Sequence, residues 1–394
     1  MSLRWTYLWR NLTRNRVRTM LTCAAVGLPM VIYVLSWAVV DGVEEFLENS
    51  ARQLRLAVAN KASIIVPLPE GHRQKIEALA RERQRAVTVC SMKWIGGTVD
   101  GKQQPLSTLG VDADTFIAAF PEFELTPQEQ EAWVRDKQAI IVGNQTAAQF
   151  GWSVGQRITI RSSIPPYAHI EFHVVSTAPR AKDKISNWFH RSFYEDRVQE
   201  MSFEDPLGKG RVSFFFVKCA SKEDLDLFRN AIDQTFAHSL DETKTQDEKA
   251  FMNEFITQQF NLPRNLTILC LVTVFVAVMA ATNTMSMNFR DRLNEYATLK
   301  SLGFRGRMIF GLVQIESLAV CALGGGLGAL TPYVAFTFTP LRKLSVPVIQ
   351  TILIRPAVCG QALVISVLIG LIAAAWPSWL AVRMHVVAAL RNLE

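Results

Sequence analysis

The sequence predicts a membrane protein: four transmembrane α-helices with a large mixed α/β extracytoplasmic domain on a helical stalk. Three observations predict this fold class. Four long stretches are apolar, basic residues gather at the ends of these stretches, and a long segment of ordinary charge separates the first two. A helix needs roughly 20 apolar residues to cross ~30 Å of hydrocarbon, and inside lipid its backbone polar groups must be bonded internally. A buried core helix explains one such stretch far more easily than four.

The predicted spans cover residues 19–40, 266–289, 308–336 and 357–382, and Glu316 is their only charged residue. The arginines before the first span resemble the basic region of a secretory signal peptide. Its apolar run is too long for a signal peptide, however, and no A-x-A-like cleavage site follows it. We therefore expect an uncleaved first span.

The placement of lysine and arginine predicts the topology. Basic residues crowd the amphipathic N-terminal segment 1–18 and the connection 290–307, and they recur in the tail 383–394. The positive-inside rule places these three regions, and hence both termini, in the cytoplasm. Residues 41–265 and the short connection 337–356 are then extracytoplasmic. The formal net charge of +7 could indicate nucleic acid, but its placement indicates membrane lipids as the partner, so no nucleic-acid partner is expected.

The extracytoplasmic segment reads as mixed α/β. Apolar residues at helical spacing predict stalk helices over about residues 41–58 and 246–262, and another helix over Asp224–Phe236. Cys90 and Cys219 both lie in this segment, where a disulfide and two buried thiols are equally open readings. Strand-like composition is found over Ser63–Val66, Ala86–Val89, Ala139–Val142, Arg157–Ile160, Phe172–Val175 and Val212–Val217.

Motifs for catalysis are missing. Gly208-Lys209 lacks the upstream glycine of a phosphate-binding loop, so we expect no ATP hydrolysis and no cofactor in this chain. His169, Glu171 and His173 would share one face of a strand, but the H-E-x-x-H spacing is not met. A solvated strand face is the preferred reading, with no metal site. No set of nucleophile and base can be nominated, so no catalytic residue is predicted.

Polar and small residues within the spans are candidate functional positions. Glu316 lies about two turns into the third span, where a lone carboxylate costs ~2.5–3.5 kcal/mol on insertion scales. Two readings stay open: a polar contact that changes in a conformational cycle, or a structural hydrogen bond to a neighbouring helix. Asn283 is a second intramembrane polar residue. Gly324, Gly325 and Gly328 are predicted to let another helix approach closely.

The connection 290–307 predicts a short cytoplasmic helix. Leu293, Tyr296, Ala297 and Lys300 fall on one helical face, and Gly303 follows the helix end. An apolar stripe with mixed charge is suited to docking on a partner.

Five sets of residues together resemble the ABC-transporter permeases of the MacB/FtsX type, and one of them is Glu316 with the glycines that follow it in the third span. The segment Leu8–Leu12 with Arg18–Thr22 resembles the family's entry into its first span. Asn283-Thr284-Met285 followed by Glu295–Phe304 is similar to its most specific motif. Trp376-Pro377-Ser378 with Val386–Arg391 resembles its C-terminal signature, and Ala139–Ile160 resembles its periplasmic core. Tyr296 departs from the family pattern, which has a small aliphatic residue there.

The resemblance implies a subunit of the bacterial cytoplasmic (inner) membrane. It implies a second permease copy, either identical or a close paralogue, and a separate ABC-type ATPase that binds ATP and Mg. A membrane-fusion adaptor protein is a further implied partner. The segment 290–307 would be the coupling helix on the ATPase, through Arg292, Leu293, Glu295, Tyr296, Ala297, Lys300 and Gly303.

Two functions fit that implication. The first is export or extraction of a hydrophobic cargo, such as a lipid, lipoprotein, peptide or drug. The second is mechanotransmission without transport, in which the external domain regulates a cell-wall hydrolase or a sensor. The size of the external domain favours the first by analogy with MacB-like members. A membrane-anchored hydrolase has no support in the sequence.

Overall fold

The computed structural model describes residues 16–99, 102–165, 167–181, 185–201, 210–260, 262–339 and 354–383. Several predictions lie outside the described residues: most of the N-terminal helix 1–18, Gly208-Lys209, most of the loop 337–356, and the tail from residue 384 with Val386–Arg391. The chain divides into two compact units. The membrane unit holds residues 1–42, 261–344 and 351–394, and the external unit is built on residues 43–260.

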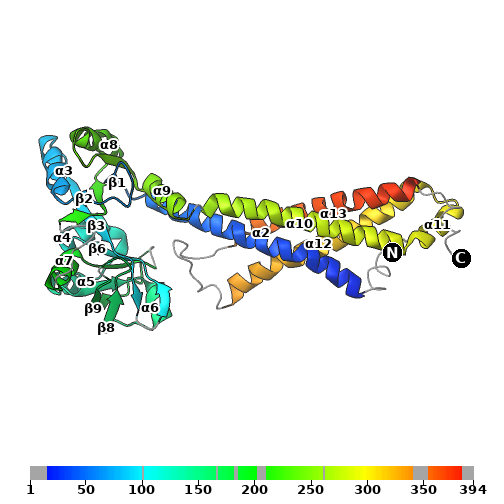
Figure 1. Ribbon diagram of the computed structural model, residues 1–394, viewed down its shortest axis with the longest axis horizontal. Helices are drawn as coiled ribbons and strands as arrows, with labels where there is room; N and C mark the ends of the chain where they lie inside the picture. The colour runs from blue at the N-terminus through cyan, green and yellow to red at the C-terminus, as the bar shows by residue number, and fades with distance from the viewer. Residues whose placement is uncertain are drawn as a thin grey trace. The chain divides into compact units, whose positions relative to one another are not determined.

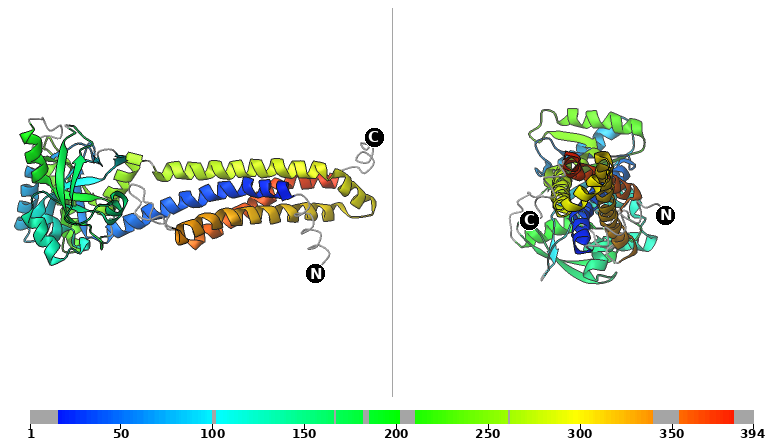
Figure 2. Two further views of the ribbon diagram at one scale, coloured as in Figure 1. Left: turned by 90° about the horizontal axis from the view of Figure 1, so that it is seen from below. Right: turned by 90° about the vertical axis from the view of Figure 1, so that its right-hand side faces the viewer.

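Within the described ranges, four helices are long and apolar enough to cross a membrane: Thr19–Ala51, Arg264–Asp291, Gly306–Phe338 and Pro356–Leu380. The four-span prediction is therefore confirmed. These segments belong to α2 (Arg16–Ala51), α10 (Leu262–Asp291), α12 (Gly306–Phe338) and α13 (Pro356–Arg383). Within the membrane unit the four helices lie side by side, and the short helix α11 (Leu293–Ser301) joins α10 to α12 (Figure 1 and Figure 2).

Backbone contact brings the membrane helices together. A Cβ atom on Gly27 of α2 would lie 2.9 Å from the carbonyl oxygen of Gly324, and one on Gly324 would lie 2.7 Å from that of Cys23. Gly328 approaches the Gly27 carbonyl, and Gly325 lies against the side chain of Ser366 in α13. Small residues permit this approach, and in lipid the gain comes from dispersion because apolar tails remove the hydrophobic driving force.

One mixed sheet of eleven strands organises the external unit, in the order β13-β1-β12-β3-β6-β10-β7-β9-β8-β4-β5. The pairs β10–β6 and β7–β9 are parallel, and the other neighbours are antiparallel. The small strands β11 and β2 form a separate pair. The strands are β1 (Arg55–Asn60), β2 (Leu68–Pro69), β3 (Val87–Trp94), β4 (Thr98–Val99), β5 (Lys102–Pro105), β6 (Thr108–Val111), β7 (Ala139–Val142), β8 (Arg157–Arg161), β9 (His169–Ser176), β10 (Asn187–His190), β11 (Arg211–Val212), β12 (Phe214–Cys219) and β13 (Thr243–Asp247).

Helices cover both faces of the sheet near β1 and β12. On β12, Phe215 and Val217 pack under α3 and α8, whereas Phe214 and Phe216 pack on the opposite face with residues of α4 and α9. This alternation follows from the pleat of a strand. The helices are α3 (Gly71–Glu82), α4 (Ala113–Ala119), η1 (Pro121–Phe123), α5 (Pro127–Arg135), α6 (Asn144–Phe150), α7 (Arg191–Glu200), α8 (Lys222–Phe236) and α9 (Glu248–Phe260).

The structure corrects two local predictions. The stalk helix predicted over 41–58 ends at Ala51, and Val58 lies in β1. All six residues of β1 are buried because the strand lies between β12 and β13 under helices on both faces. Its apolar residues 56–59 therefore lack the alternation of a half-buried strand and can be mistaken for part of a helix. Ser63–Val66 forms turns and no strand. The other predicted strands and the helix over Asp224–Phe236 are confirmed, with ends shifted by a few residues.

The two external cysteines are free thiols. Cys90 on β3 pairs in register with Phe216, and Cys219 on β12 pairs with Val87, so they are not opposite one another. Both are buried, and burial raises the pKa of each thiol to about 12. They therefore act as small apolar core residues.

Candidate functional site

The predicted coupling segment forms a junction of three helices, which we call the α11 junction. Arg292 stands between α10 and α11 at the N-cap position of α11, and its side chain is 4% exposed. Its Nη1 donates to Glu316 Oε2 of α12 at 2.7 Å, and its Nε donates to Glu295 Oε2 at 3.0 Å. Asn288 of α10 donates through Nδ2 to Glu316 Oε1 at 3.2 Å. The Glu316 carboxylate thus holds both α10 and the start of α11.

This geometry explains how a carboxylate is tolerated in the third span. An isolated charge in lipid is expensive, so intramembrane carboxylates face the bundle and find a partner. Glu316 is 9% exposed and has a cation on one oxygen and an amide on the other. The contact to neighbouring helices is present.

The apolar stripe of α11 packs inward. Tyr296 and Ala297 are 2% and 0% exposed. The Tyr296 ring stacks on Phe289 of α10 with 5.8 Å between centroids, and Ile309 and Val313 of α12 complete the cluster. The predicted docking face is therefore contradicted at Tyr296 and Ala297, which are buried, whereas Leu293 and Lys300 are partly exposed. An amphipathic helix buries its apolar side on its own protein when a neighbouring helix offers one.

The opposite face of α11 is exposed. It carries Asn294, Thr298 and Ser301, followed by Leu302, which is 71% exposed. Gly303 ends the segment at φ +90, a conformation that favours glycine, and nothing lies within 4 Å of the position its Cβ would take. This face, which the sequence analysis did not select, is the surface of α11 that a partner protein can reach.

Two further predicted residues lie at the edges of this region. Lys300 donates from Nζ to the carbonyl oxygen of Val382 at 3.0 Å, which ties α11 to α13. Asn283 lies on the exposed side of α10, near the exposed Met279 and Met287. Among the four spans α10 buries the smallest share of its residues. Asn283 is therefore not brought together with Glu316.

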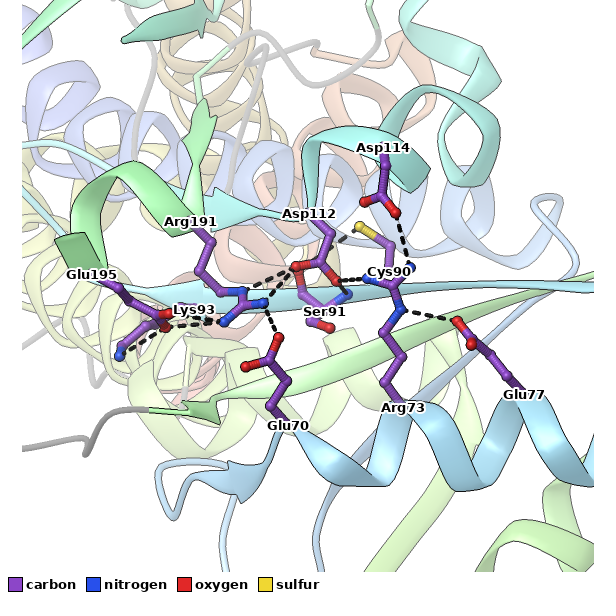
Figure 3. Close-up of polar contacts among 10 residues, drawn as sticks. All are labelled: Glu70, Arg73, Glu77, Cys90, Ser91, Lys93, Asp112, Asp114, Arg191 and Glu195. Atoms are coloured by element: carbon purple, nitrogen blue, oxygen red, sulfur yellow. Dashed lines mark hydrogen bonds and ion pairs between the residues drawn. The ribbon is translucent and has the colours of Figure 1, made fainter. Parts of the chain in front are cut away.

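The external unit contains a buried charge network that the sequence analysis missed. Asp112 stands at the N-cap position of α4, but its side chain does not cap that helix. Its carboxylate instead accepts from Arg73 Nη1 at 2.8 Å, from Arg191 Nε and Nη2 at 3.0 and 2.8 Å, and from the Ser91 backbone N–H at 3.0 Å. Figure 3 shows Asp112 between the two guanidinium groups.

The remaining members extend this Asp112 network over four elements. Arg191 also pairs with Glu70 and Glu195, Lys93 pairs with Glu195, and Arg73 pairs with Glu77 and Asp114 (Figure 3). Burial alone would lower the pKa of Arg191, but its three carboxylate partners outweigh burial and raise it. The i,i+4 pairs Arg73–Glu77 and Arg191–Glu195 were the only local signal. The contacts that join α3, β3, α4 and α7 are long-range.

The three residues considered as metal ligands, His169, Glu171 and His173, do not converge on one site. Glu171 pairs with Arg157 at 3.2 Å across the β8–β9 hairpin. His173 Nδ1 lies 2.8 Å from Asp136 Oδ2, and His169 is exposed. Across the described ranges no group of three or more histidine, cysteine, aspartate or glutamate side chains could hold a metal ion.

Two family models match the chain. The MacB-like periplasmic core domain matches residues 19–235, and the FtsX-like permease C-terminal region matches residues 267–386. An uncharacterized ABC transporter permease protein of Mycobacterium tuberculosis is 24% identical over 194 residues, which are 48% of this chain and 21% of that protein. The match thus spans about a fifth of the length of this curated relative.

Three solved structures are similar to part of this chain. The periplasmic region of MacB from Actinobacillus actinomycetemcomitans is 11% identical, with a TM-score of 0.34, and covers 54% of this chain and 97% of that one. The extracellular domain of the noncanonic ABC-type transporter YknZ from Gram-positive bacteria is 9% identical, with a TM-score of 0.32, and covers 49% and 99%. A domain of a putative permease protein from Porphyromonas gingivalis is 11% identical, with a TM-score of 0.28, and covers 50% and 88%.

Proposed function

Because the chain belongs to the ABC-transporter permeases that join a MacB-like periplasmic core domain to an FtsX-like permease module, we propose that it couples a separate ATPase to movement of its external unit. This movement of the external unit exports or extracts a hydrophobic cargo. The α11 junction carries this proposal. The short helix α11 has one exposed face. Its N-cap residue Arg292 bonds to Glu316 of α12, and Asn288 of α10 bonds to the same carboxylate.

The coupling step follows from these contacts. The ATPase binds the exposed face of α11, at Asn294, Thr298 and Leu302. When the ATPase pair closes on ATP, α11 is displaced, and Arg292 transfers that displacement to Glu316 in α12. Asn288 of α10 donates to the same Glu316 carboxylate, so the displacement also reaches α10. ATP and Mg stay in the ATPase subunit, and this chain supplies no catalytic residue.

A second permease copy fits the exposed side of α10. A polar side chain within a span is costly in lipid and usually faces a protein surface. Asn283 is exposed to the outside of the described helices, among methionines and other apolar residues. Contact with the same helix of another copy, or of a close paralogue, would remove this amide from lipid. We place the assembly in the bacterial inner membrane with both termini in the cytoplasm, the external unit outside, and a membrane-fusion adaptor as its further partner.

The test is recovery of the ATPase with detergent-solubilised chain from native membranes. Replacing Thr298 and Leu302 together by aspartate should lower the recovered ATPase at least about tenfold, because a charge is buried in the contact without a partner. Leu240→Asp is the matched control, since Leu240 is fully exposed in the external unit. Recovery at the wild-type level with the double variant would place the ATPase elsewhere.

The same experiment separates the two functions considered for this family. An adaptor of the membrane-fusion class that co-purifies with chain and ATPase supports export. A cell-wall hydrolase or a sensor kinase in that position supports mechanotransmission instead. Tyr296→Asp is informative as a contrast, because Tyr296 is buried and its loss should unfold the α11 junction before it affects docking.

A further inference from the structure

The exposed side of α13 carries a stripe whose chemical character changes along the helix. Leu368, Ile372, Trp376 and Trp379 are each at least 41% exposed. They follow one another at intervals of three or four residues, so they share one face of the helix. Arg383, also exposed, continues the same spacing at the end of α13. The face therefore runs from aliphatic through aromatic to basic.

The length of this stripe matches one leaflet of a bilayer. From Leu368 to Trp379 the helix rises about 16 Å, at 1.5 Å per residue. The hydrocarbon core of a bilayer is ~30 Å thick, so one leaflet contributes ~15 Å. Tryptophan is enriched where hydrocarbon meets the headgroups, and basic residues lie beyond that level. The stripe thus presents aliphatic, aromatic and basic side chains in the order of the chain, glycerol and phosphate of a phospholipid.

Arg383 is positioned to bind a phosphate group. Its guanidinium lies 4.1 Å from the centre of the Trp379 ring, and that ring lies 5.4 Å from the Trp376 ring between centroids. Within the described part of the chain, the Arg383 side chain has no hydrogen bond or ion pair with another residue. A guanidinium over an aromatic ring keeps its N–H donors, which can bind a phosphate in bidentate fashion.

Further basic residues lie at the same end of the membrane unit. Lys300 Nζ donates to the carbonyl oxygen of Val382 at 3.0 Å. A Cβ atom on Gly306 would lie 3.4 Å from Val382 Cγ1, and the exposed Arg305 and Arg307 flank that glycine. The end of α11, the start of α12 and the end of α13 therefore meet at Val382 (Figure 1). This meeting brings three more cations to the basic end of the stripe.

The charge at this end is not balanced by carboxylates. Residues 290–316 together with Arg383 include six basic and three acidic side chains. Two of the acidic side chains, Glu295 and Glu316, bond to Arg292, and the third belongs to the last residue of α10. The formal surplus is three positive charges. Each basic residue near an anionic lipid surface contributes about 1 kcal/mol of attraction, whereas a zwitterionic headgroup has no net charge.

We propose that this face of α13 binds one anionic phospholipid of the cytoplasmic leaflet. The phosphate lies at Arg383, the glycerol lies beside Trp379 and Trp376, and an acyl chain follows Ile372 and Leu368. The site goes beyond the proposed function and rests on it only for the cytoplasmic position of this end of α13. All its residues belong to the membrane unit, so binding requires neither the ATPase nor the external unit.

The test is lipid binding to the purified full chain in detergent, followed by native mass spectrometry. Dioleoylphosphatidylglycerol and dioleoylphosphatidylcholine have the same chains and differ in headgroup charge. The first phosphatidylglycerol should bind at least about tenfold more tightly than the first phosphatidylcholine, a difference of about 1.4 kcal/mol. Inorganic phosphate should not displace it, because phosphate lacks the acyl chain. Equal affinity of the two lipids, or displacement by phosphate, overturns the proposal.

Arginine variants locate the site. Arg383→Gln should lower the affinity for phosphatidylglycerol about fivefold, which corresponds to about 1 kcal/mol, and leave phosphatidylcholine unchanged. Arg290→Gln is the matched control, because Arg290 is an exposed arginine in the last turn of α10 at the same end of the unit. An equal loss in both variants, or no loss in Arg383→Gln, contradicts the site. Loss of ATPase recovery with Arg383→Gln at unchanged lipid affinity would assign this surface to the ATPase instead.

A second measurement does not depend on the arginine variants. Phosphatidylglycerol with brominated chains should quench tryptophan fluorescence of the wild-type chain more than brominated phosphatidylcholine does, because the bound chain lies beside Trp376 and Trp379. Replacing both tryptophans by phenylalanine should abolish this difference between the lipids. A difference that persists in the double variant places the anionic lipid elsewhere. Failure to recover an ATPase from membranes would refute the proposed coupling but would leave both lipid measurements unaffected.

Discussion

At the α11 junction one ion pair, Arg292–Glu316, carries the buried charge, whereas around Asp112 three basic side chains share five carboxylates. In the junction the surroundings are apolar helices, and Arg292 also pairs with the partly exposed Glu295. In the Asp112 network each arginine has further carboxylates within reach. Both regions bury charge, but each arginine of the network has two carboxylates besides Asp112, whereas Arg292 has the partly exposed Glu295 besides Glu316.

The contrast teaches what each arrangement is suited to. A buried pair that loses one member leaves a charge that nothing else can neutralise, so such a contact is either present or broken. That behaviour suits an element that transmits movement. A network in which charges are shared changes gradually as members are removed, which suits a domain that must keep its shape.

The largest effect is expected at Glu316. Glu316→Ala leaves Arg292 buried without its main partner, and breaking a buried pair in this way costs about 3–5 kcal/mol. We expect the variant to insert in the membrane but to unfold at lower temperature in detergent, and to lose stimulation of the ATPase. Thermal unfolding and ATP turnover of the assembled complex measure the two effects.

The double variant Arg292→Met with Glu316→Leu serves as its control. Replacing both charges by apolar groups of similar size is often neutral for stability. The double variant should therefore recover thermal stability while ATP turnover stays uncoupled. Recovery of both properties would mean that the ion pair is structural only.

A second test asks whether substitutions destabilise the membrane unit at other close contacts or only at the Arg292–Glu316 ion pair. Gly324→Ala puts a Cβ 2.7 Å from the Cys23 carbonyl oxygen and 2.9 Å from its Cα, so the two backbones must separate. Overpacking of this kind costs about 1–3 kcal/mol, and rigid backbone puts the value toward the upper end. Gly311→Ala on the same helix meets nothing within 4 Å and should be neutral or stabilising. Equal thermal stability of the two variants would refute close α2–α12 contact.

A smaller loss is expected in the Asp112 network. Asp112→Asn removes the charge shared by two arginines, but Arg191 keeps Glu70 and Glu195, and Arg73 keeps Glu77 and Asp114. A charged hydrogen bond contributes about 1.5–3 kcal/mol, and these remaining partners put the loss near 1.5 kcal/mol. Chemical denaturation of the full chain, followed by a probe in the external unit, gives the value. A loss as large as that of Glu316→Ala would remove the distinction drawn above.

The smallest effect concerns mild acid. His190 is 3% exposed and lies edge-on to Trp133, and burial lowers its pKa from 6.5 to about 4. The folded state therefore binds fewer protons than the unfolded state, so stability falls as pH drops below about 6.5. Between pH 7.5 and 6 the loss from His190 is about 0.8 kcal/mol. Burial lowers the pKa of His72 in the same direction, so the quantity to measure is the difference in pH slope between the wild type and His190→Gln. Identical slopes would show that His190 does not titrate in this way.

Sequence reasoning succeeded where a pattern is local. Four apolar stretches predicted four spans, and the spacing of Leu225, Phe228 and Ile232 predicted α8. It failed for β1, because a strand buried on both faces has no alternation to distinguish it from a buried helix. The periodicity of α11 correctly predicted which residues share its apolar face. That face was predicted to be exposed to a partner, because periodicity does not show which other helices cover a face.

The candidate sites illustrate the same limit. Glu316 was noticed because a carboxylate within a span is unusual, but Arg292 was not identified as its partner, since that contact depends on how the chain turns between α10 and α12. The Asp112 network likewise unites residues from distant parts of the chain. No local pattern distinguishes its charges from those on a solvated surface.

The position of β1 bears on how the protein is made. This strand is the first part of the external sheet to be synthesised, yet both of its neighbours, β12 and β13, come from the far end of the same unit. The strand β1 therefore stays unpaired, with its apolar side chains uncovered, while almost the whole external unit crosses the membrane. Long-range pairing of this kind is slow and leaves aggregation-prone surface exposed in the meantime. The external unit thus cannot complete its core until translocation nears the second span, which ties its folding to insertion of that span.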